Sequence, residues 1–559
     1  MSSPTGHEHR PTLPGSSSDR TTGPAAPDPR RWRALAVLAL AVSLIVIDGT
    51  IVNVALPTMI GDLPLTFSQA QWVTTLYSLV FAALLITTGR LGDRYGRRTL
   101  LFLGVAAFAV GSALAGLASG PTTLIAARAV QGVGGAMVLP ATLSTVNATF
   151  RGRERAMAFG VWGATISGAA AIGPLLGGWL TTGVGWRWVF YVNLPLAALI
   201  AAGAAAWVPE TRQDDDARGF DTGGFLTSVI GMGGLVFGLI EGRTLGWWTP
   251  LASGWARSWP LSPAALALAV GAAALAGFVA VEVRRAAVGA TVLLDLRLFR
   301  LGSFTWGNTA AMVVAMGEFG LLFVLPLYLQ NVRGLSPIGA GWVLAVMALG
   351  AFGSGAVAGP LARATTPATV ATTGLTLEAV GVAVLAVVIS PTVPVWTVAA
   401  ALVVYGVGLG MASAQLTGTV LSEVPPAQSG QGSATQSTVR QLGSALGVAV
   451  IATVLAASVN GAASGRLGDV PELSQVPTEV TAGLEDSLAS SAGSVLPALR
   501  EGTGRAAALP APAREAAADA LAEAFTSGSR PPLWVGSAFL AVGVAATLRL
   551  PRTKVDQLR

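Results

Sequence analysis

Five ionisable side chains stand inside long apolar stretches of the sequence: Asp48, Arg128, Glu318, Glu378 and Arg440. Charge is costly in such surroundings and is retained for function or for pairing. If the stretches are helices rising 1.5 Å per residue, Asp48 and Arg128 lie roughly 12 Å and 9 Å from the outer ends of theirs. Burial and a nearby cation act in opposite directions on a carboxylate's affinity for protons. The pair therefore predicts a proton-exchanging group, with a permanent structural ion pair as the alternative.

The other three charges support less specific interpretations. Glu318 falls in the middle of its stretch, where it would carry a second proton or attract cationic molecules, unless it is a hydrogen-bonded structural acid. Glu378 is interpreted as structural. Arg440 lies roughly 12 Å from the inner end of its stretch and is expected to pair with an acid or with an anionic substrate.

The composition is that of a membrane protein. Of 559 residues, 52% are hydrophobic and only 11% are charged, whereas soluble proteins carry about a quarter charged residues. There is no cysteine, which excludes disulfides and cysteine metal sites. The two histidines lie in the N-terminal tail, so no metal site is expected. Basic residues are spread between apolar stretches, which indicates membrane orientation rather than nucleic-acid binding.

About fourteen stretches are long enough to cross a bilayer, since a membrane helix needs roughly 20 mostly apolar residues. The predicted spans are 34–56, 71–89, 99–118, 122–148, 156–181, 188–207, 222–241, 261–283, 303–330, 337–360, 368–390, 394–422, 432–458 and 531–549.

The distribution of arginine predicts the orientation, because cytoplasmic loops are enriched in Lys and Arg. With the N-terminus inside, the inner loops hold Arg90, Arg94, Arg97, Arg98, Arg151, Arg153, Arg155, Arg212, Arg218, Arg284, Arg285, Arg297, Arg300 and Arg363. The short outer loops hold only Arg187, Arg243, Arg257 and Arg333. Both termini are therefore expected in the cytoplasm, with the protein in a bacterial plasma (inner) membrane.

A glycine- and arginine-rich loop joins the second and third predicted spans. Its motif residues are Gly89, Arg90, Gly92, Asp93, Arg94, Gly96, Arg97 and Arg98. Glycines let two helix ends approach closely, and an aspartate here can accept helix-terminal N–H groups or pair with arginine. The loop resembles the signature loop of the major facilitator superfamily. The resemblance implies a latch between two helix bundles on the cytoplasmic side.

Three further stretches resemble the fourteen-span drug:proton antiporter branch of that superfamily. The first runs from Ile47 to Pro57, and the second, from Arg128 to Gly135, resembles the family's proton-transfer motif. The third resembles the antiporter motif that separates exporters from uptake symporters, and a merely structural glycine-rich helix is its alternative. Its motif residues are Gly163, Gly168, Gly173, Pro174, Gly177 and Gly178.

The resemblance implies an all-α major facilitator fold with two six-helix bundles and two inserted helices. The implied domains are a disordered cytoplasmic tail (1–33), the N-terminal bundle (34–208), the inserted helices with linkers (209–302), the C-terminal bundle (303–458 and 531–549), a long extracytoplasmic loop (459–530) and a cytoplasmic C-terminal tail (550–559). An Ala-rich part of that loop, around Arg514–Phe525, is expected to be helical. The proton-coupling residues would be Asp48, Arg128 and Glu318.

The predicted function is export of hydrophobic or amphipathic small molecules in exchange for protons. A substrate cavity with a few polar groups would be lined by Asn53, Gln131, Trp162, Trp306, Asn308, Tyr328, Gln436 and Arg440. No nucleotide-binding motif or catalytic set is present, so we expect no cofactor and no enzyme activity, and a monomer driven by the proton gradient. A same-fold symporter for metabolite uptake and a transport-dead receptor or scaffold are the alternatives.

Overall fold

The computed structural model describes residues 30–150, 152–211, 221–251, 258–290, 292–425, 429–474, 476–503, 506–507 and 509–551. Most of both predicted tails therefore lies outside the described residues. The described chain is all-helical, as predicted, and twelve of its helices are long and apolar enough to cross a membrane. Two further long helices cover the fifth and fourteenth predicted spans. They are α5 (Gly152–Gly183) and α17 (Ala511–Thr547).

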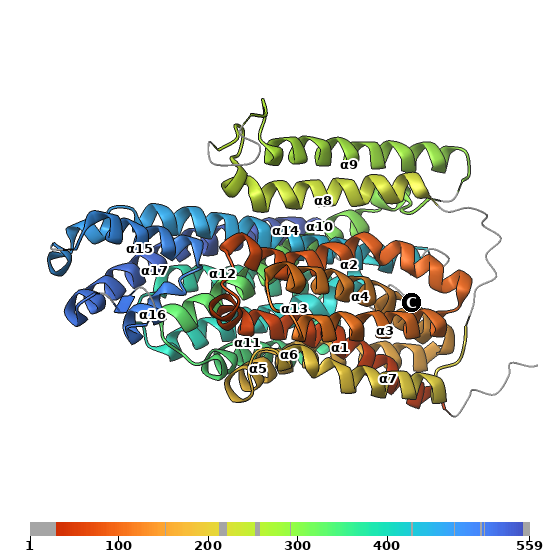
Figure 1. The fold of residues 1–559 in the computed structure, drawn as a ribbon. Helices are drawn as coiled ribbons and strands as arrows, with labels where there is room; N and C mark the ends of the chain where they lie inside the picture. Colours follow the sequence, from red (N-terminus) through yellow and green to blue (C-terminus); the bar gives the residue numbers. More distant parts are fainter. Residues whose placement is uncertain are drawn as a thin grey trace, which may run out of the picture.

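The N-terminal bundle is formed by six long elements packed side by side (Figure 1). They are α1 (Arg31–Asp62), α2 (Phe67–Tyr95), α3 (Arg97–Gly116), α4 (Pro121–Thr149), α5, and the pair α6 (Trp188–Tyr191) and α7 (Asn193–Trp207). The sixth predicted span is thus interrupted at Val192. That interruption places a polar residue at the start of α7.

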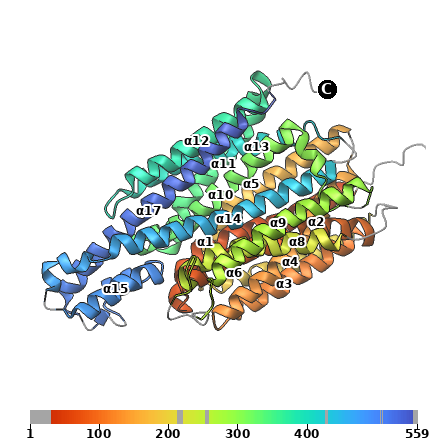
Figure 2. The ribbon, with the colours of Figure 1, turned by 90° about the horizontal axis from the view of Figure 1, so that it is seen from above.

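The C-terminal bundle contains α10 (Gly302–Leu327, continued by a π-helical turn to Val332), α11 (Pro337–Ala364), α12 (Pro367–Val388), α13 (Val395–Val420), α14 (Ser429–Ala463) and α17. The inserted pair α8 (Thr222–Leu245) and α9 (Pro263–Ala287) forms a hairpin. The hairpin packs on α2 and α14, along the seam between the bundles (Figure 2).

The segment predicted as a long loop is largely helical. Helix α14 continues to Ala463, α17 begins at Ala511, and α15 (Thr478–Ser490) and α16 (Val495–Glu501) lie between them. We call residues 464–510, with the adjoining ends of α14 and α17, the cap. Alanine-rich sequence forms helix without being apolar enough for a membrane span, so a search for apolar stretches ends α14 early and starts α17 late.

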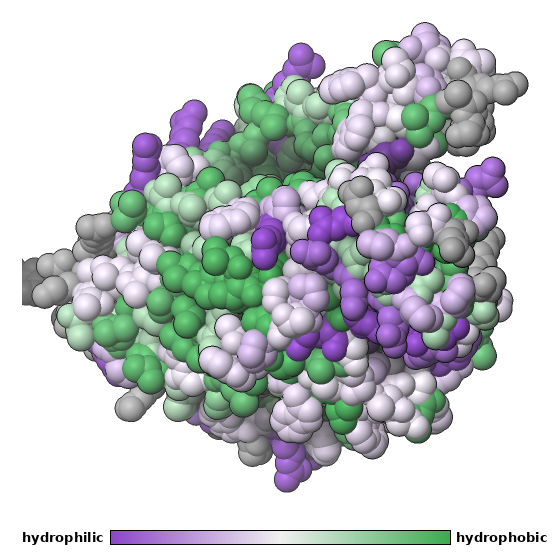
Figure 3. All heavy atoms as spheres, turned by 90° about the vertical axis from the view of Figure 1, so that its left-hand side faces the viewer, coloured by the Kyte–Doolittle hydropathy of each residue, from purple (hydrophilic) through white to green (hydrophobic). Residues whose placement is uncertain are grey.

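The cap has its own buried side chains and is attached to the C-terminal bundle. Leu488, Leu496, Leu499, Leu521 and Phe525 are almost completely buried within it. Attachment comes from hydrogen bonds: the Asn331 amide donates to the Ala492 carbonyl at 3.0 Å, and Arg530 donates to the Ile389 carbonyl at 3.1 Å. Helix α17 runs from the cap to the opposite end of the molecule, where it ends at Thr547 (Figure 2). We call these two ends the cap end and the tail end. Viewed from the cap end, the α8–α9 hairpin forms a projecting lobe (Figure 3).

The two bundles share buried side chains mainly toward the cap end. One hydrophobic core there combines residues of α1, α2, α4 and α5 with residues of α10, α11, α13 and α14. A smaller one at the seam joins α2, α8 and α14. Toward the tail end, each bundle has a core of its own among the described residues. Among the described residues, the buried side chains that the two bundles share are therefore concentrated toward the cap end.

Candidate functional site

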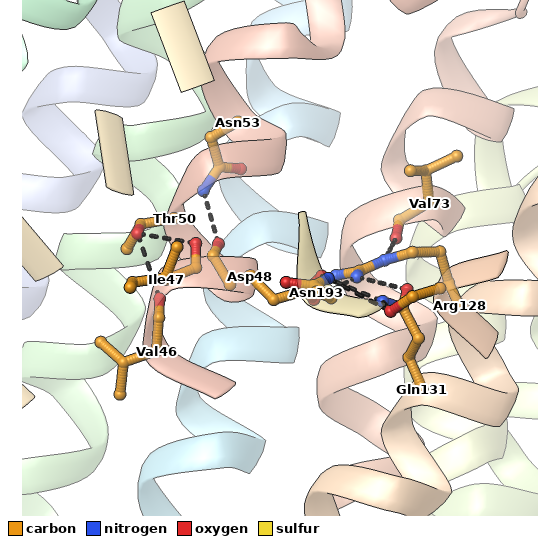
Figure 4. A network of polar contacts seen from close by, with 11 residues as sticks. Val46, Ile47, Asp48, Thr50, Asn53, Val73, Arg128, Gln131 and Asn193 are labelled. Carbon is orange, nitrogen blue, oxygen red and sulfur yellow. Dashed lines mark hydrogen bonds and ion pairs between the residues drawn. The ribbon is translucent and has the colours of Figure 1, made fainter. Parts of the chain in front are cut away.

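Asp48 and Arg128 form an ion pair in the middle of the N-terminal bundle (Figure 4). Arg128 Nη1 on α4 donates to Asp48 Oδ2 on α1 at 2.5 Å, and Gln131 Nε2 donates to Asp48 Oδ1 at 2.9 Å. Asp48 is 0% and Arg128 1% exposed. Charges removed from water so completely require a partner with good geometry, and each supplies that partner to the other.

Two residues that were not identified from the sequence complete this network. Asn193, at the start of α7, donates from Nδ2 to Asp48 Oδ1 at 2.9 Å and to Ser112 Oγ at 3.1 Å. Ser112, on α3, also accepts a hydrogen bond from Gln131 Nε2 at 2.8 Å. The sequence feature that could have identified Asn193 is its polar side chain within a predicted apolar span. Four helices thus converge on one carboxylate.

The guanidinium of Arg128 is held from α2 as well. Its Nε donates to the Val73 carbonyl at 3.0 Å, and its carbon lies 4.3 Å from the centre of the Tyr77 ring. A cation over an aromatic face is attracted to it, more strongly when both are desolvated. Asp48 accepts three hydrogen bonds and donates none among the described contacts, which is the pattern of an ionised carboxylate.

A second charged cluster lies in the C-terminal bundle. Glu318 on α10 has its Oε2 4.0 Å from Nη2 of Arg440 on α14. Electrostatic interactions extend from both to Glu378 on α12. Glu378 is 0% exposed, and neither of its oxygens has a hydrogen-bond partner among the described residues. The Arg440 partner left open by the sequence is thus Glu318.

Arg440 also lines a small cavity of about 10 Å³, enough for roughly one water molecule. Gln436 lines it too and donates from Nε2 to Thr417 Oγ1 at 3.3 Å. Among the predicted cavity residues, Gln436 and Arg440 are the two that line this cavity.

The remaining predicted cavity residues are placed differently. Gln131 is 0% exposed within the Asp48 network. Tyr328 donates its hydroxyl to the Ser390 carbonyl at 2.6 Å, and Trp306 stacks with Arg549 at 4.8 Å. Asn53 and Asn308 donate to carbonyls one turn earlier in their own helices. Trp162 packs against the N-terminal core. Local backbone and neighbouring helices thus satisfy the Tyr328 hydroxyl and the amide N–H groups of Asn53 and Asn308, whereas Trp162 Nε1 and Asn308 Oδ1 are buried without a partner among the described residues.

The predicted latch loop packs against its own bundle. Gly96 has φ +111°, and a Cβ there would come within 2.6 Å of the Glu210 carboxylate. That carboxylate accepts from the backbone N–H groups of Arg98 and Thr99 at 3.1 and 3.2 Å, as an acid does at a helix N-terminus. Glu210 was not identified from the sequence.

The other latch residues also contact the N-terminal bundle. Arg97 donates to the Ser144 carbonyl at 3.2 Å, and Gly89 faces Pro140. The Leu100 side chain approaches Gly92, Arg94 is exposed beside Tyr95, and Arg90 is partly buried. The Asp93 side chain lies outside the described residues. None of these described contacts reaches the C-terminal bundle.

The predicted antiporter motif seals the cap-end contact between helices. A Cβ at Gly177 would come 2.7 Å from the Ile51 carbonyl oxygen, and one at Gly178 would come 2.6 Å from that of Pro337. Gly173 faces Thr50, and the Pro174 carbonyl faces Gly341 of α11. Small residues thus let α1, α5 and α11 meet backbone to backbone. Gly168, nearer the tail end, faces open space, and the surroundings of Gly163 lie outside the described residues.

The fold and these motifs define a helical membrane transporter for small molecules, and the chain belongs to the Major Facilitator Superfamily, whose profile matches residues 38–448. It is 33% identical to the probable actinorhodin transporter of Streptomyces coelicolor, over 96% of this chain and 94% of that one. It is 35% identical to the multidrug efflux pump LfrA of Mycolicibacterium smegmatis, over 81% and 86%. Among solved structures, it is similar to a bacterial homologue of the lysosomal transporter Spinster in an inward-facing conformation, with a TM-score of 0.57, 17% identity, and coverage of 94% and 98%.

Proposed function

We propose that this chain exports hydrophobic or amphipathic small molecules, antibiotics among them, in exchange for protons by alternating access. The observation that carries the proposal is the buried Asp48–Arg128 pair, which puts a titratable carboxylate at the junction of four helices. Relatives named for actinorhodin transport and multidrug efflux support the export direction. The glycine contacts of α5 with α1 and α11 support it as well.

The arginine distribution assigns the tail end to the cytoplasm of a bacterial cell, with both termini there. We infer from the concentration of shared buried side chains at the cap end that this conformation is the one open to the cell interior. In an exporter this state loads substrate and has released its proton inward. An ionised Asp48 held by three donors fits that state. Protonation from outside would neutralise Asp48 and loosen Arg128 from it.

Both bundles of the transport pathway come from one chain, so we propose that it works as a monomer and needs no cofactor. Free energy would come from the proton gradient alone. We assign proton coupling to Asp48, Arg128 and Glu318, and substrate contact to Gln436 and Arg440 at the small cavity. The loop from Gly89 to Arg98 would engage the C-terminal bundle only in the state closed to the cytoplasm.

The test is substrate efflux from loaded cells with and without a protonophore, at intact ATP levels. Wild-type efflux is expected to stop when the gradient collapses. Asp48→Asn is expected to abolish active efflux, normalised to the membrane level of each protein, because the amide keeps the shape but has no titratable proton. Asp62→Asn is the matched control, since Asp62 ends the same helix in a half-exposed pair with Arg187. Efflux that persists without a gradient, or in Asp48→Asn, would contradict the proposal.

A further inference from the structure

Glu378 is a buried acid without a hydrogen-bond partner. It lies near the middle of α12, is 0% exposed, and neither carboxyl oxygen has a partner among the described residues. A Cβ built at Gly408 of α13 would come 3.0 Å from its Cγ, so α13 packs directly over this side chain. Glu378 therefore lies in a closed pocket between helices rather than facing lipid.

The charged and titratable groups around Glu378 come from three other helices. Glu318 on α10, Arg440 on α14 and Tyr405 on α13 interact with it electrostatically. The Tyr405 hydroxyl is buried and has no partner among the described residues. Helix α17 has no charged residue from Pro531 to Thr547, and the charge of α11 is Arg363 in its last turn. Arg440 is thus the positive group in this neighbourhood, and it lies beside Glu318.

An ionised carboxylate in such a pocket is far more costly than a neutral carboxylic acid. Burial without a partner costs a polar group a few kcal/mol and an ionised group much more. One arginine cannot neutralise two carboxylates, and Arg440 is engaged by Glu318, which is itself mostly buried. The arrangement is therefore balanced when Glu318 carries the negative charge and Glu378 carries a proton.

A route to water passes through Glu318. Its Oε2 lies 4.0 Å from Arg440 Nη2, and Arg440 has 39% of its side chain exposed and lines the small cavity. The three side chains thus run from a fully buried position to a partly exposed one. The two carboxyls are not hydrogen-bonded to each other among the described residues, so the proposed transfer needs a water molecule between them: the proton leaves the Glu378 O–H bond for that water, which passes a proton to the Glu318 carboxylate, and Glu318 then releases it to water beside Arg440.

We propose that Glu378, with Glu318 as its exchange partner, is a second proton-binding site of this transporter, in the bundle opposite Asp48. The proposal rests on the proposed proton-coupled export and extends it to more than one proton per cycle. Arg440 has a positioning role, because it holds Glu318 ionised and so leaves the proton on Glu378.

The first test uses the purified full-length protein and does not require transport. Infrared difference spectra between neutral and alkaline buffer report the carbonyl stretch of carboxylic acids that are still protonated at neutral pH. Wild type is expected to show a band at neutral pH that Glu378→Gln lacks. Glu241→Gln is the control, because the Glu241 carboxylate accepts hydrogen bonds from Ser68 Oγ at 2.6 Å and Trp72 Nε1 at 2.7 Å and is expected to be ionised. The control should keep the band.

The second test is the substrate gradient that reconstituted vesicles sustain under an imposed pH difference. One proton moving down one pH unit supplies about 1.4 kcal/mol, or tenfold in concentration. Glu378→Gln should therefore lower the limiting gradient about tenfold per pH unit, while Glu241→Gln leaves it unchanged.

Glutamine has the shape of the neutral acid, so Glu378→Gln should fold at wild-type yield, and failure to fold would overturn the proposal. An unchanged band, or an unchanged limiting gradient, would overturn it as well. The infrared result separates the two proposals: a Glu378 band in a protein whose export ignores the proton gradient leaves the site in place and removes the proposed antiport. Gradient-driven export in a protein that lacks the Glu378 band would keep the proposed antiport and remove the second proton-binding site.

Discussion

The two charged clusters of this protein occupy opposite bundles and differ in how their carboxylates are satisfied. Around Asp48, an arginine and two amides supply three donors, and a serine and a tyrosine ring complete the shell. Around Glu378 the described structure supplies no donor at all, and its neighbour Glu318 has one arginine at 4.0 Å. The same type of group is therefore held in its ionised form in one bundle and left without support for that form in the other.

Under the proposed second proton-binding site, Asp48 is ionised and Glu378 is protonated within a single conformation. A carboxylate with a full donor shell is stabilised as an anion, whereas an unpartnered buried carboxyl is tolerated as the neutral acid. Removing a charge should therefore harm the first cluster and leave the second nearly unaffected in stability. The following variants test that contrast.

The largest difference between the two clusters is expected when the arginine of each is removed. Arg128→Met leaves Asp48 buried and unpaired, which should lower the free energy of unfolding by about 3–5 kcal/mol. Arg440→Met should cost at most about 1 kcal/mol, because Arg440 is partly exposed and its ion pair is long. Thermal unfolding of the purified variants measures both. The double variant Arg128→Met, Asp48→Asn should recover most of the loss; equal losses for the two arginines would refute the contrast.

An intermediate effect is expected from trimming the Asp48 shell. Asn193→Ala removes one hydrogen bond to Asp48 and one to Ser112, and should cost about 1–3 kcal/mol of unfolding free energy. Asn53→Ala is the matched control, since the Asn53 amide donates only to its own helix among the described contacts. Asn53→Ala should lower the free energy of unfolding clearly less than Asn193→Ala does. If both variants unfold at the same temperature, Asn193 does not support the ionised carboxylate.

The smallest effect on stability is expected for Glu318→Gln, within about 0.5 kcal/mol, because its carboxylate has one long ion pair. Its effect on transport is the informative one. If Glu318 is part of a proton-binding pair, Glu318→Gln should reduce export of one cationic and one neutral compound to the same extent at normal protein level. A loss confined to the cationic compound would instead make Glu318 a recognition charge, through its attraction for a cation at low dielectric.

The sequence predicted the first cluster better than the second because of how each is built. Charged residues are rare in apolar helices, so Asp48 and Arg128 stand out and their depths can be compared. Asn193 and Ser112 do not stand out, since amides and hydroxyls are common in such helices and often bond their own backbone. The unpartnered state of Glu378 depends on the rotation of three other helices about their axes, which one sequence does not specify.

The fold was predicted more completely than its ends. Apolar stretches located each long helix of the two bundles and of the hairpin. They did not locate the start of α17, twenty residues before its predicted span, because alanine-rich helix carries little apolar signal. The separate prediction of helix around Arg514–Phe525 is confirmed, and this stretch belongs to α17. Tyr328 shows the same limit at a single residue: its type suggested a cavity, but a carbonyl at Ser390 lies within reach of its hydroxyl.

The cap has a mechanical consequence. Helices α14 and α17 contain 35 and 37 residues, so at 1.5 Å per residue they are roughly 52 and 55 Å long, well beyond the roughly 30 Å of a bilayer core. Both belong to the C-terminal bundle. The described hydrogen bonds that attach the cap are made to residues of that same bundle. Among the described hydrogen bonds, the cap is therefore tied to one bundle alone. If the proposed alternating access rotates that bundle, the cap rotates with it, and a probe at the far end of the cap would move farther than one placed within the bundle.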